Sequence, residues 1–298
     1  MMTTKKRMGG PYDEQYAEMY NDIWYKNPVW KVEGKFHIQT IAELIKPEGT
    51  WLDVGCGTGF LLSNFPDCNR MGLDLSEAML KQAKKCNPDV RFVQQSMAEE
   101  NSALEGAFDL VTCTGQPWSY LTSMDTIEKA VSNLAKWTAK DGKCMLTPID
   151  ISDVMDHQLS PVYDLSGVPN ETPIITGILW DYKELDTVYH NCLSPNLDQW
   201  IRWFSVHFHK VEIFRWPHEP EFLLIPRRVI VCSEKREVGD QRPPVIIEHP
   251  VPGGVRKQQE QANTPTYLSN KQLLGELGYR VKSGILVRAA VQRLFGKK

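Results

Sequence analysis

Three glycines at alternate positions, Gly55, Gly57 and Gly59, are spaced as in a ligand-binding turn, and the carboxylate of Asp53 lies two residues ahead of the first. Glycine lets the backbone adopt conformations closed to other residues, and it lets a ligand approach the main chain closely. Apolar runs on either side predict a buried strand, a tight turn and a helix that starts at Phe60. We therefore expect this turn to bind a ligand, although a purely structural tight turn is the alternative.

The spacing of the glycines restricts the kind of ligand. The dinucleotide fingerprint needs a glycine at position 60, which is Phe60 here. A phosphate-binding loop needs Lys and then Ser or Thr after its last glycine, and Phe60-Leu61 do not fit. The carboxylate of Asp53 would repel a pyrophosphate and attract a cation. The sequence thus favours a cationic ligand over a phosphate ester.

Alternating strands and helices must position this turn. Further strands are predicted at 71–75, 90–93, 108–113, 144–147, 211–214 and 228–232, and helices at 77–86, 197–204 and from Asp125 to about 141. The pattern predicts an α/β fold: a doubly wound, Rossmann-like, seven-stranded and mostly parallel sheet with helices on both faces. Ligands of such sheets bind at the carboxyl ends of the strands, where we expect the site.

The segments on either side of the predicted sheet suggest a lid, a cap insertion, a linker and a tail. Tyr12, Tyr16 and Tyr20 are four residues apart, so they share one face of a helix in a predicted N-terminal lid, 10–46, or simply pack on the domain. A β-rich cap insertion is predicted at 151–195, with strands at 174–185 and 188–193. The main α/β domain would span 1–237, followed by a linker rich in Pro, Gly and Gln at 238–265 and a basic helical tail at 266–298.

Composition narrows the functional class. The chain has 298 residues, 42% of them hydrophobic, and a net charge of −3, which argues against a general nucleic-acid binder. It has no run of eighteen apolar residues, and its seven cysteines are never in C-x-x-C spacing, so a cytoplasmic protein with reduced thiols is expected. The basic helix at 285–298 could contact a membrane surface or an acidic partner, or pack on its own domain or on a second copy in a homo-oligomer.

The set Asp53-x-Gly55-x-Gly57-x-Gly59, Asp74 after the second strand and Phe108-Asp109-Leu110-Val111 on the fourth resembles the class I S-adenosylmethionine-dependent methyltransferases, over about residues 10–235. The resemblance implies that the glycine turn runs beneath the methionine part of the cofactor, with Asp53 close to its amino group. Asp74, 19 residues past Gly55, would accept both ribose hydroxyls.

The cofactor carries an ammonium and a sulfonium, which a carboxylate and aromatic faces stabilise. Leu75 and Met79 would flank the adenine. Ser96 stands where the family often has an acid, so Ser96 or the backbone of Met97 or Ala98 would bind the adenine amine. The predicted cofactor-binding residues are Tyr12, Tyr20, Asp53, Gly55, Cys56, Gly57, Gly59, Asp74, Leu75, Met79, Ser96, Met97, Thr114 and Gln116.

The acceptor is expected to be a small molecule, because the stretch 114–120 lacks the Asn-Pro-Pro-Tyr signature of nucleic-acid base methylation. Candidate catalytic and acceptor-site residues are Tyr16, Trp118, Tyr120, Asp150 and His190. His207 and His209 face opposite ways on a strand, so no metal is expected. The predicted activity is N- or O-methylation of an amine, amino sugar or natural-product hydroxyl. The alternatives are a non-catalytic cofactor-binding subunit that recruits a partner and, less favoured because of Phe60, an NAD-dependent dehydrogenase.

Overall fold

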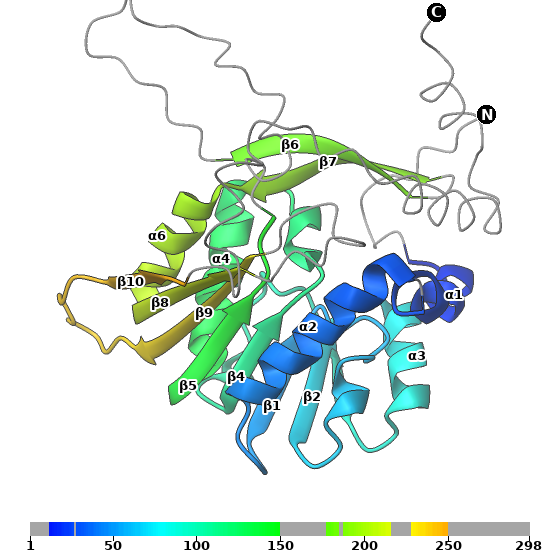
Figure 1. Cartoon of the computed structure of the whole chain (residues 1–298), viewed down its shortest axis with the longest axis horizontal. Coiled ribbons are helices and arrows are strands. Elements are labelled where there is room, and N and C mark those ends of the chain that lie inside the picture. Colours follow the sequence, from blue (N-terminus) through cyan, green and yellow to red (C-terminus); the bar gives the residue numbers. More distant parts are fainter. Residues whose placement is uncertain (1–11, 27, 150–176, 185–186, 216–227, 250–298) are drawn as a thin grey trace, which may run out of the picture.

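The computed structural model describes residues 12–26, 28–149, 177–184, 187–215 and 228–249 (Figure 1). Asp150, the first part of the predicted cap and the basic tail lie outside these ranges. The helices are α1 Glu14–Trp24, α2 Pro28–Leu44, α3 Glu77–Cys86, α4 Met124–Trp137 and α6 Leu197–His207, with 3-10 turns η1 Leu62–Asn64, η2 Ser102–Leu104 and η3 Pro117–Tyr120. The strands are β1 Thr50–Val54, β2 Asn69–Asp74, β3 Arg91–Gln94, β4 Phe108–Cys113, β5 Thr138–Leu146, β6 Gly177–Glu184, β7 Thr187–Pro195, β8 Phe208–Arg215, β9 Arg228–Lys235 and β10 Val245–Glu248.

A mostly parallel sheet forms the centre of the fold, in the order β10-β8-β9-β5-β4-β1-β2-β3. Strands β3, β2, β1, β4 and β5 run parallel, and β9 runs antiparallel to its neighbours β5 and β8. The chain moves outward from β1 in one direction through β2 and β3, and in the other through β4 and β5. This change of direction between β1 and β4 is where open α/β sheets bind ligands.

Helices cover both faces of the sheet, as the alternating pattern predicts (Figure 1). On one face α4 and α6 bury a cluster that includes Trp118, Trp137 and Trp200. On the other face α2 and α3 contribute Ile41 and Leu80 to a second cluster. The Rossmann-like α/β prediction is therefore confirmed, although within the described ranges the sheet has eight strands and not seven.

The eighth strand, β10, falls inside the predicted linker 238–265. It pairs in parallel with β8, and His249 at its end contacts Glu212 (Nε2 to Oε1, 3.1 Å) and stacks on Phe214 with ring centroids 4.1 Å apart. This four-residue segment between Pro244 and Pro250 is too short to show a periodicity that predicts a strand, so the strand forms because of its contacts with β8. The division of the chain into domain, linker and tail stays a prediction.

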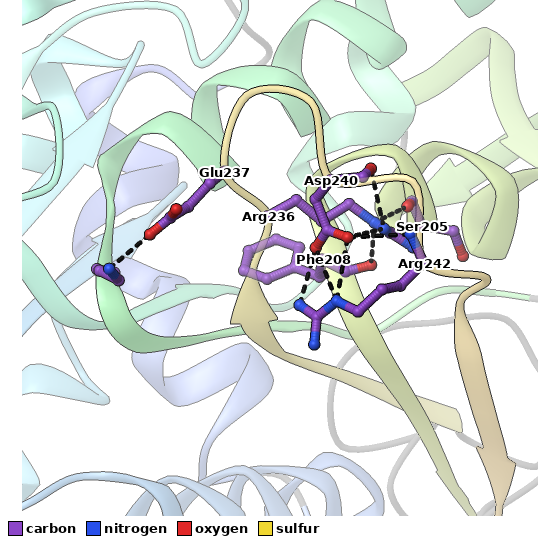
Figure 2. Close-up of polar contacts among 7 residues, drawn as sticks. Ser205, Phe208, Arg236, Glu237, Asp240 and Arg242 are labelled. Atoms are coloured by element: carbon purple, nitrogen blue, oxygen red, sulfur yellow. Dashed lines mark hydrogen bonds and ion pairs between the residues drawn. The ribbon is translucent and has the colours of Figure 1, made fainter.

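A polar cluster holds the turn that leads from β9 to β10 (Figure 2). Arg236, whose side chain is 9% exposed, donates from Nε to the carbonyl oxygens of Ser205 and Phe208, at 2.9 and 3.2 Å, and so satisfies carbonyls at the end of α6. Asp240 lies between Arg236 and Arg242, 3.5 and 2.8 Å from their guanidinium nitrogens. These contacts fix the path of the chain into the edge strand.

Two expected helices differ from the structure. After the glycine turn there is only η1, because Pro66 follows at once and disfavours helical backbone at Phe65. The helix predicted to begin at Asp125 is capped by Ser123, whose side chain accepts from the Thr126 amide, and it ends at Trp137. Strand β5 then begins at Thr138 rather than near 144.

The predicted pair of strands at 174–193 is present as the antiparallel hairpin β6–β7. Its base packs on the α4 side of the sheet, where Leu193 and Trp180 join the core cluster of Trp118. The Trp180 indole donates to Ser194 Oγ at 2.8 Å. In Figure 1 the hairpin and α1 lie beyond the same end of the sheet.

Candidate functional site

The glycine turn joins β1 to η1 and lies at the carboxyl end of β1. Gly55, Gly57 and Gly59 have φ of +73°, +53° and +70°, a region that other residues rarely adopt. The Gly55 amide donates to the Leu73 carbonyl at 2.7 Å, which ties the turn to β2. A Cβ on Gly55 would lie 2.3 Å from Pro117 Cγ, so the turn and the start of η3 touch. Only glycine fits at this contact.

Asp74 at the end of β2 holds the turn through its carboxylate. Oδ2 accepts from the Gly57 amide and Oδ1 from the Ser76 amide, both at 2.8 Å. Desolvation raises the pKa of Asp74, and these amide hydrogen bonds oppose that rise. Each carboxylate oxygen has a second lone pair, so Asp74 could accept two further hydroxyl donors while it holds the turn.

Asp53 lies in β1 and is 2% exposed. Its Oδ1 accepts from Thr112 Oγ1 at 2.7 Å, and Thr112 accepts from the Trp51 indole at 2.9 Å. Desolvation raises the pKa of Asp53 to about 7, against the lowering effect of the Thr112 hydrogen bond and with a further rise from Asp74. A buried carboxylate of this kind gains most from a cation placed beside it.

Tyr25 and Phe60 border the same region. Their rings stack with centroids 3.7 Å apart. Burial, then the charges of Asp53 and Glu33, raise the pKa of Tyr25, so its phenol stays protonated. The carboxyl groups of Asp53 and Glu33 and the neutral phenol of Tyr25 therefore lie near one another. This arrangement favours a positively charged ligand over a negatively charged one.

Helix α1 covers the glycine turn. Its Tyr16 and Tyr20 form one aromatic cluster with Tyr12, which lies just before the helix. Tyr12 lies 5.1 Å from Tyr16 and 6.1 Å from Tyr20 between ring centroids, and its hydroxyl donates to Tyr120 Oη at 3.2 Å. Figure 1 shows α1 beside α3, and Ser76, the N-cap of α3, donates to the Tyr12 carbonyl at 3.3 Å. The three tyrosines that were predicted to share one helix face are thus packed together, and the hydroxyl of Tyr12 joins them to Tyr120 in η3.

The residues predicted around the adenine flank the ends of β2 and β3. Leu75 is 54% exposed, which is unusual for leucine and suits a flat apolar ligand, whereas Met79 and Met97 are buried. Ser96 Oγ accepts from the Ala98 amide at 3.3 Å. The Met97 carbonyl accepts from Asn133 at 3.0 Å and so faces α4. Of this group Leu75 and Ser96 are the more accessible.

Three further predicted residues line the turn and the loop after β4. Cys56 is buried, and burial raises the pKa of its thiol. Thr114 is buried at the end of β4. Gln116 has φ of +64° and its carbonyl accepts from the Ser119 amide and hydroxyl, which shapes η3. The loop after β4 is therefore held by its own hydrogen bonds and packs through Pro117 against the glycine turn.

The candidate acceptor residues occupy different environments. Tyr16 and Tyr120 belong to the aromatic cluster, and the Tyr16 hydroxyl accepts from the Trp24 indole at 3.0 Å. Trp118 is only 1% exposed and lies edge-on to Trp200, with ring centroids 4.9 Å apart, so it faces the core.

His190 is exposed on the β6–β7 hairpin, with Nδ1 3.0 Å from Asp181 Oδ2. The structure brings Tyr16 and Tyr120 together with the cofactor candidates Tyr12 and Tyr20, whereas Trp118 packs in the core and His190 lies on the hairpin. The fifth candidate, Asp150, falls outside the described residues. The roles of these residues stay predictions.

Sequence analysis missed Thr112 and the contact of Asn21 with Thr58. Thr112 pairs with Asp53 in the register of β1 and β4, and its signal was a polar residue among the buried positions at the end of β4. Thr58 Oγ1 lies 2.5 Å from Asn21 Oδ1, which joins α1 to the glycine turn. A contact between residues 37 positions apart left no local signal.

Neither a metal-binding cluster nor a membrane-spanning helix is found among the described residues. Across residues 12–249, less the gaps stated above, no group of three His, Cys, Asp or Glu side chains is arranged to hold a metal ion. No helix of the described chain is both long enough and apolar enough to span a bilayer.

Comparison with known proteins identifies what the chain is similar to. Residues 52–142 match the family described as a methyltransferase domain. A stretch of 140 residues is 26% identical to a dTDP-4-amino-2,3,4,6-tetradeoxy-D-glucose N,N-dimethyltransferase of Saccharopolyspora spinosa, covering 46% of this chain and 55% of that protein. A stretch of 146 residues is 30% identical to a dTDP-3-amino-3,4,6-trideoxy-alpha-D-glucopyranose N,N-dimethyltransferase of Streptomyces venezuelae, covering 46% and 58%. The matches thus span a little over half the length of these curated relatives.

A solved structure shares the fold. An S-adenosylmethionine-dependent methyltransferase from Clostridium acetobutylicum ATCC 824 aligns with a TM-score of 0.50 and 17% identity, over 74% of this chain and 97% of that one. At this identity the likeness concerns the fold, a Rossmann-like α/β methyltransferase fold.

Proposed function

We propose that the chain is a class I S-adenosylmethionine-dependent methyltransferase, because residues 52–142 match the family described as a methyltransferase domain. It would bind S-adenosylmethionine at the glycine turn and transfer its methyl group to a small-molecule acceptor. The matched segment contains the glycine turn, Asp74 and the Thr112 that supports Asp53. The segment that matches the family therefore also contains the carboxylates of Asp53 and Asp74, which would bind the cofactor.

The observation that carries this proposal is the buried carboxylate of Asp53 at the carboxyl end of β1. A carboxylate with a pKa near 7 costs free energy to ionise in the free protein, and a neighbouring cation offsets that cost. The cofactor supplies an ammonium group of the right sign. A pyrophosphate at this place would meet repulsion from Asp53 and from Asp74, which speaks against a dinucleotide.

The proposed roles of the other residues follow from their positions. Asp74 would accept the ribose hydroxyls on its free lone pairs, and the exposed Leu75 would lie against the adenine. The tyrosines of α1 and Tyr120 would enclose the sulfonium end and exclude water. Ser96 would accept one hydrogen bond from the adenine amine.

Methyl transfer from a sulfonium is an in-line displacement with an activated leaving group. The lone pair of the acceptor nitrogen or oxygen forms the bond to the methyl carbon, the carbon–sulfur bond breaks, and its electrons stay on sulfur. An amine acceptor must arrive deprotonated, and the product loses a proton afterwards. Alignment and desolvation are then the main tasks of Tyr16, Tyr120 and the loop after β4.

An amino sugar is the acceptor class we favour, with N-methylation as the reaction. Two curated relatives are N,N-dimethyltransferases of dTDP-amino sugars, and they align over 46% of this chain. The β6–β7 hairpin, whose base packs beside η3, would act as a cap over the acceptor. Amines and hydroxyls of other small molecules are the competing acceptors.

Turnover with a panel of amines, amino sugars and hydroxylated metabolites tests this proposal. We expect products that carry one or two additional methyl groups by mass spectrometry, with one S-adenosylhomocysteine formed for each methyl group transferred. Binding of S-adenosylhomocysteine without turnover on any panel member would favour the non-catalytic subunit. An absence of both binding and turnover would refute the assignment.

A further inference from the structure

An aspartate and a histidine lie side by side on the β6–β7 hairpin. Asp181 Oδ2 lies 3.0 Å from His190 Nδ1, and Asp181 Oδ1 accepts from the Asn191 amide at 3.0 Å. One carboxylate of β6 thus contacts both the backbone and the imidazole of the facing strand. We call the two side chains the Asp181–His190 pair.

A bulge in β7 places the imidazole beside the carboxylate. Where the register of the hairpin shifts, two residues of β6 are matched by three residues of β7. His190 and Asn191 therefore both face Asp181, and Asn191 has φ of +56°, which asparagine tolerates better than most residues. Bulges re-aim side chains and are over-represented next to active sites.

The carboxylate determines which imidazole nitrogen carries the proton. The Asn191 amide first and the His190 imidazole second lower the pKa of Asp181, so its carboxylate is ionised near neutral pH and only accepts hydrogen bonds. Nδ1 of His190 must therefore be the donor, which leaves a lone pair on Nε2 of the neutral ring. Nε2 has no hydrogen-bond partner within the part of the chain that the structure describes.

The contact is of more use to chemistry than to stability. Both side chains are about half exposed, and ion pairs at such positions contribute little to the free energy of unfolding. The amide hydrogen bond from Asn191 already holds the bulge. What the imidazole gains from the carboxylate is a fixed tautomer and a fixed orientation, the arrangement in which a histidine accepts a proton through Nε2.

The hairpin carries the pair across the end of the sheet where the ligands are expected to bind. In Figure 1 it extends over the carboxyl end of the sheet, from above α4 and α6 toward the side of α1. Its base packs on η3, and Leu193 there joins the core cluster of Trp118. His190 is three residues from Leu193, about 10 Å farther along β7. The pair therefore lies beyond η3, over the same end of the sheet as the aromatic cluster of α1.

The pair continues the face of the hairpin on which Leu193 meets that cluster. Leu179 pairs directly with Leu193, so these two side chains share a face. Asp181, two residues past Leu179 on β6, shares it as well. Leu193 is 8% exposed, whereas Leu179 is 64% exposed. Farther from the base this face is thus open, and an apolar side chain lies next to the pair, as a surface for an organic amine would require.

An amine acceptor needs a base of this kind. Amino groups are mostly protonated at neutral pH, and an ammonium group has no lone pair with which to attack a methyl group. The structure describes four acceptor candidates, Tyr16, Trp118, Tyr120 and His190, and imidazole is the side chain among them that ordinarily exchanges a proton near neutral pH. Asp181 is the charged group that contacts this imidazole within the described ranges.

We propose that His190 takes the proton from the ammonium group of the acceptor through Nε2 and that Asp181 is the positioning residue for this step. The inference rests on the proposed function and makes it more specific: the acceptor binds as a protonated amine. The acceptor N–H bond breaks, its electron pair stays on nitrogen as the lone pair for methyl transfer, and the proton passes to Nε2. The Asp181 carboxylate stabilises the imidazolium, which then gives its proton to water because the ring is accessible.

Nitrogen-15 NMR of the full chain tests the positioning without any ligand. We expect the neutral ring of His190, assigned by the loss of its signals in His190→Gln, to carry its proton on Nδ1. Asp181→Asn keeps an oxygen for the Asn191 amide and can present an N–H group to the imidazole, so the proton should move largely to Nε2. A neutral ring protonated on Nε2 in the unaltered protein would overturn the proposed base.

Kinetics with the amine of the acceptor panel that is methylated fastest test the proton transfer. His190→Gln should lower kcat by about 100-fold or more at about pH 7, the size of losing a general base, with little change in KM. The loss should shrink as the pH approaches the pKa of the acceptor amine, because the solution then supplies the deprotonated form. Asp181→Asn should lower kcat with the same dependence on pH.

His249→Gln is the matched control. His249 is also a histidine beside a carboxylate, with Nε2 3.1 Å from Glu212 Oε1, but it lies at the end of the edge strand β10. This variant should leave kcat, its pH profile and the tautomer of His190 unchanged. Because Asp181 and His190 are both exposed, their variants should keep the unfolding midpoint of the unaltered protein.

A loss of activity in His190→Gln that does not depend on pH, or no loss, would overturn the proposed base, while turnover itself would leave the proposed function standing. Methylation of hydroxyl compounds without methylation of any amine would have the same meaning. No turnover of any panel member would refute both the base and the proposed activity. Binding of S-adenosylhomocysteine would then show whether the cofactor site remains.

Discussion

The Thr112 hydroxyl donates a hydrogen bond of 2.7 Å to Asp53 Oδ1, and the two residues are directly opposite each other in the register of β1 and β4. Both are almost fully buried. Thr112 can stabilise the charged carboxylate, but desolvation outweighs it and leaves the pKa of Asp53 at about 7. The protonation of this one side chain should therefore govern both stability and cofactor binding.

Stability should fall as pH rises through the raised pKa of Asp53. The carboxyl is neutral in the folded protein up to about pH 7 but titrates near 3.8 when unfolded, so the folded state binds more protons between these values. Its contribution is fully present below pH 3.8 and is lost by about pH 7. Asp53→Asn should remove this component, measured as the difference between the pH profiles of the unfolding free energies of the two proteins.

Cofactor binding should depend on pH in the opposite sense. The ammonium of S-adenosylhomocysteine favours ionised Asp53, and amino groups of this type stay protonated below about pH 7.7. Affinity should rise by up to about tenfold per pH unit between pH 5 and 7. Thr112→Val removes a hydrogen bond that lowers the pKa, so its profile should move to higher pH. An identical profile in Asp53→Asn would contradict this account.

Asp74→Ala should weaken cofactor binding by roughly 1 to 3 kcal/mol, the size of losing hydrogen bonds to a charged acceptor. It should also loosen the glycine turn, because the amides of Gly57 and Ser76 lose their acceptor. Asp74→Asn keeps one acceptor oxygen and serves as the comparison. Calorimetry gives the affinity and denaturant unfolding the stability. An unchanged affinity would remove Asp74 from the site.

Gly55→Ala should destabilise the protein more than Gly106→Ala. Both glycines have positive φ, +73° and +64°, so alanine is strained by about 1 kcal/mol or more at either place. At Gly55 the added Cβ would also meet Pro117 Cγ at 2.3 Å, whereas nothing lies within 4 Å at Gly106. The difference in denaturation midpoint measures the clash. Equal midpoints would mean that Pro117 moves aside freely.

A double-mutant cycle can measure the contact between α1 and η3. Tyr12→Phe, Tyr120→Phe and the double variant remove the hydroxyl contact of 3.2 Å while keeping the rings. We expect a coupling of roughly 0.5 to 1.5 kcal/mol in unfolding and faster release of S-adenosylhomocysteine from each variant. Strictly additive effects would show that the two hydroxyls do not act together.

Local signals predicted most of the fold. Strand β4 and helix α3 coincide with their expected residues, because an apolar run and a capped amphipathic pattern each depend on near neighbours. The glycine spacing marked the turn for the same reason. The candidate site was predictable to the extent that its residues lie at strand ends, as with Asp53 and Asp74.

Long-range packing decided what the sequence could not predict. Strand β10 depends on its pairing with β8, and Trp118, a candidate for the acceptor site, packs in the core against Trp200. An aromatic residue in a loop gives the same local signal whether it faces a ligand or the core.

Calorimetry with S-adenosylhomocysteine and with NAD, on the full chain and on Asp53→Asn, tests the central claim most directly. We predict one saturable site for S-adenosylhomocysteine, clearly weaker binding in Asp53→Asn, and no comparable binding of NAD. No heat and no thermal stabilisation with S-adenosylhomocysteine, or tighter binding of NAD, would contradict the assignment of the glycine turn as a site for a cationic nucleoside.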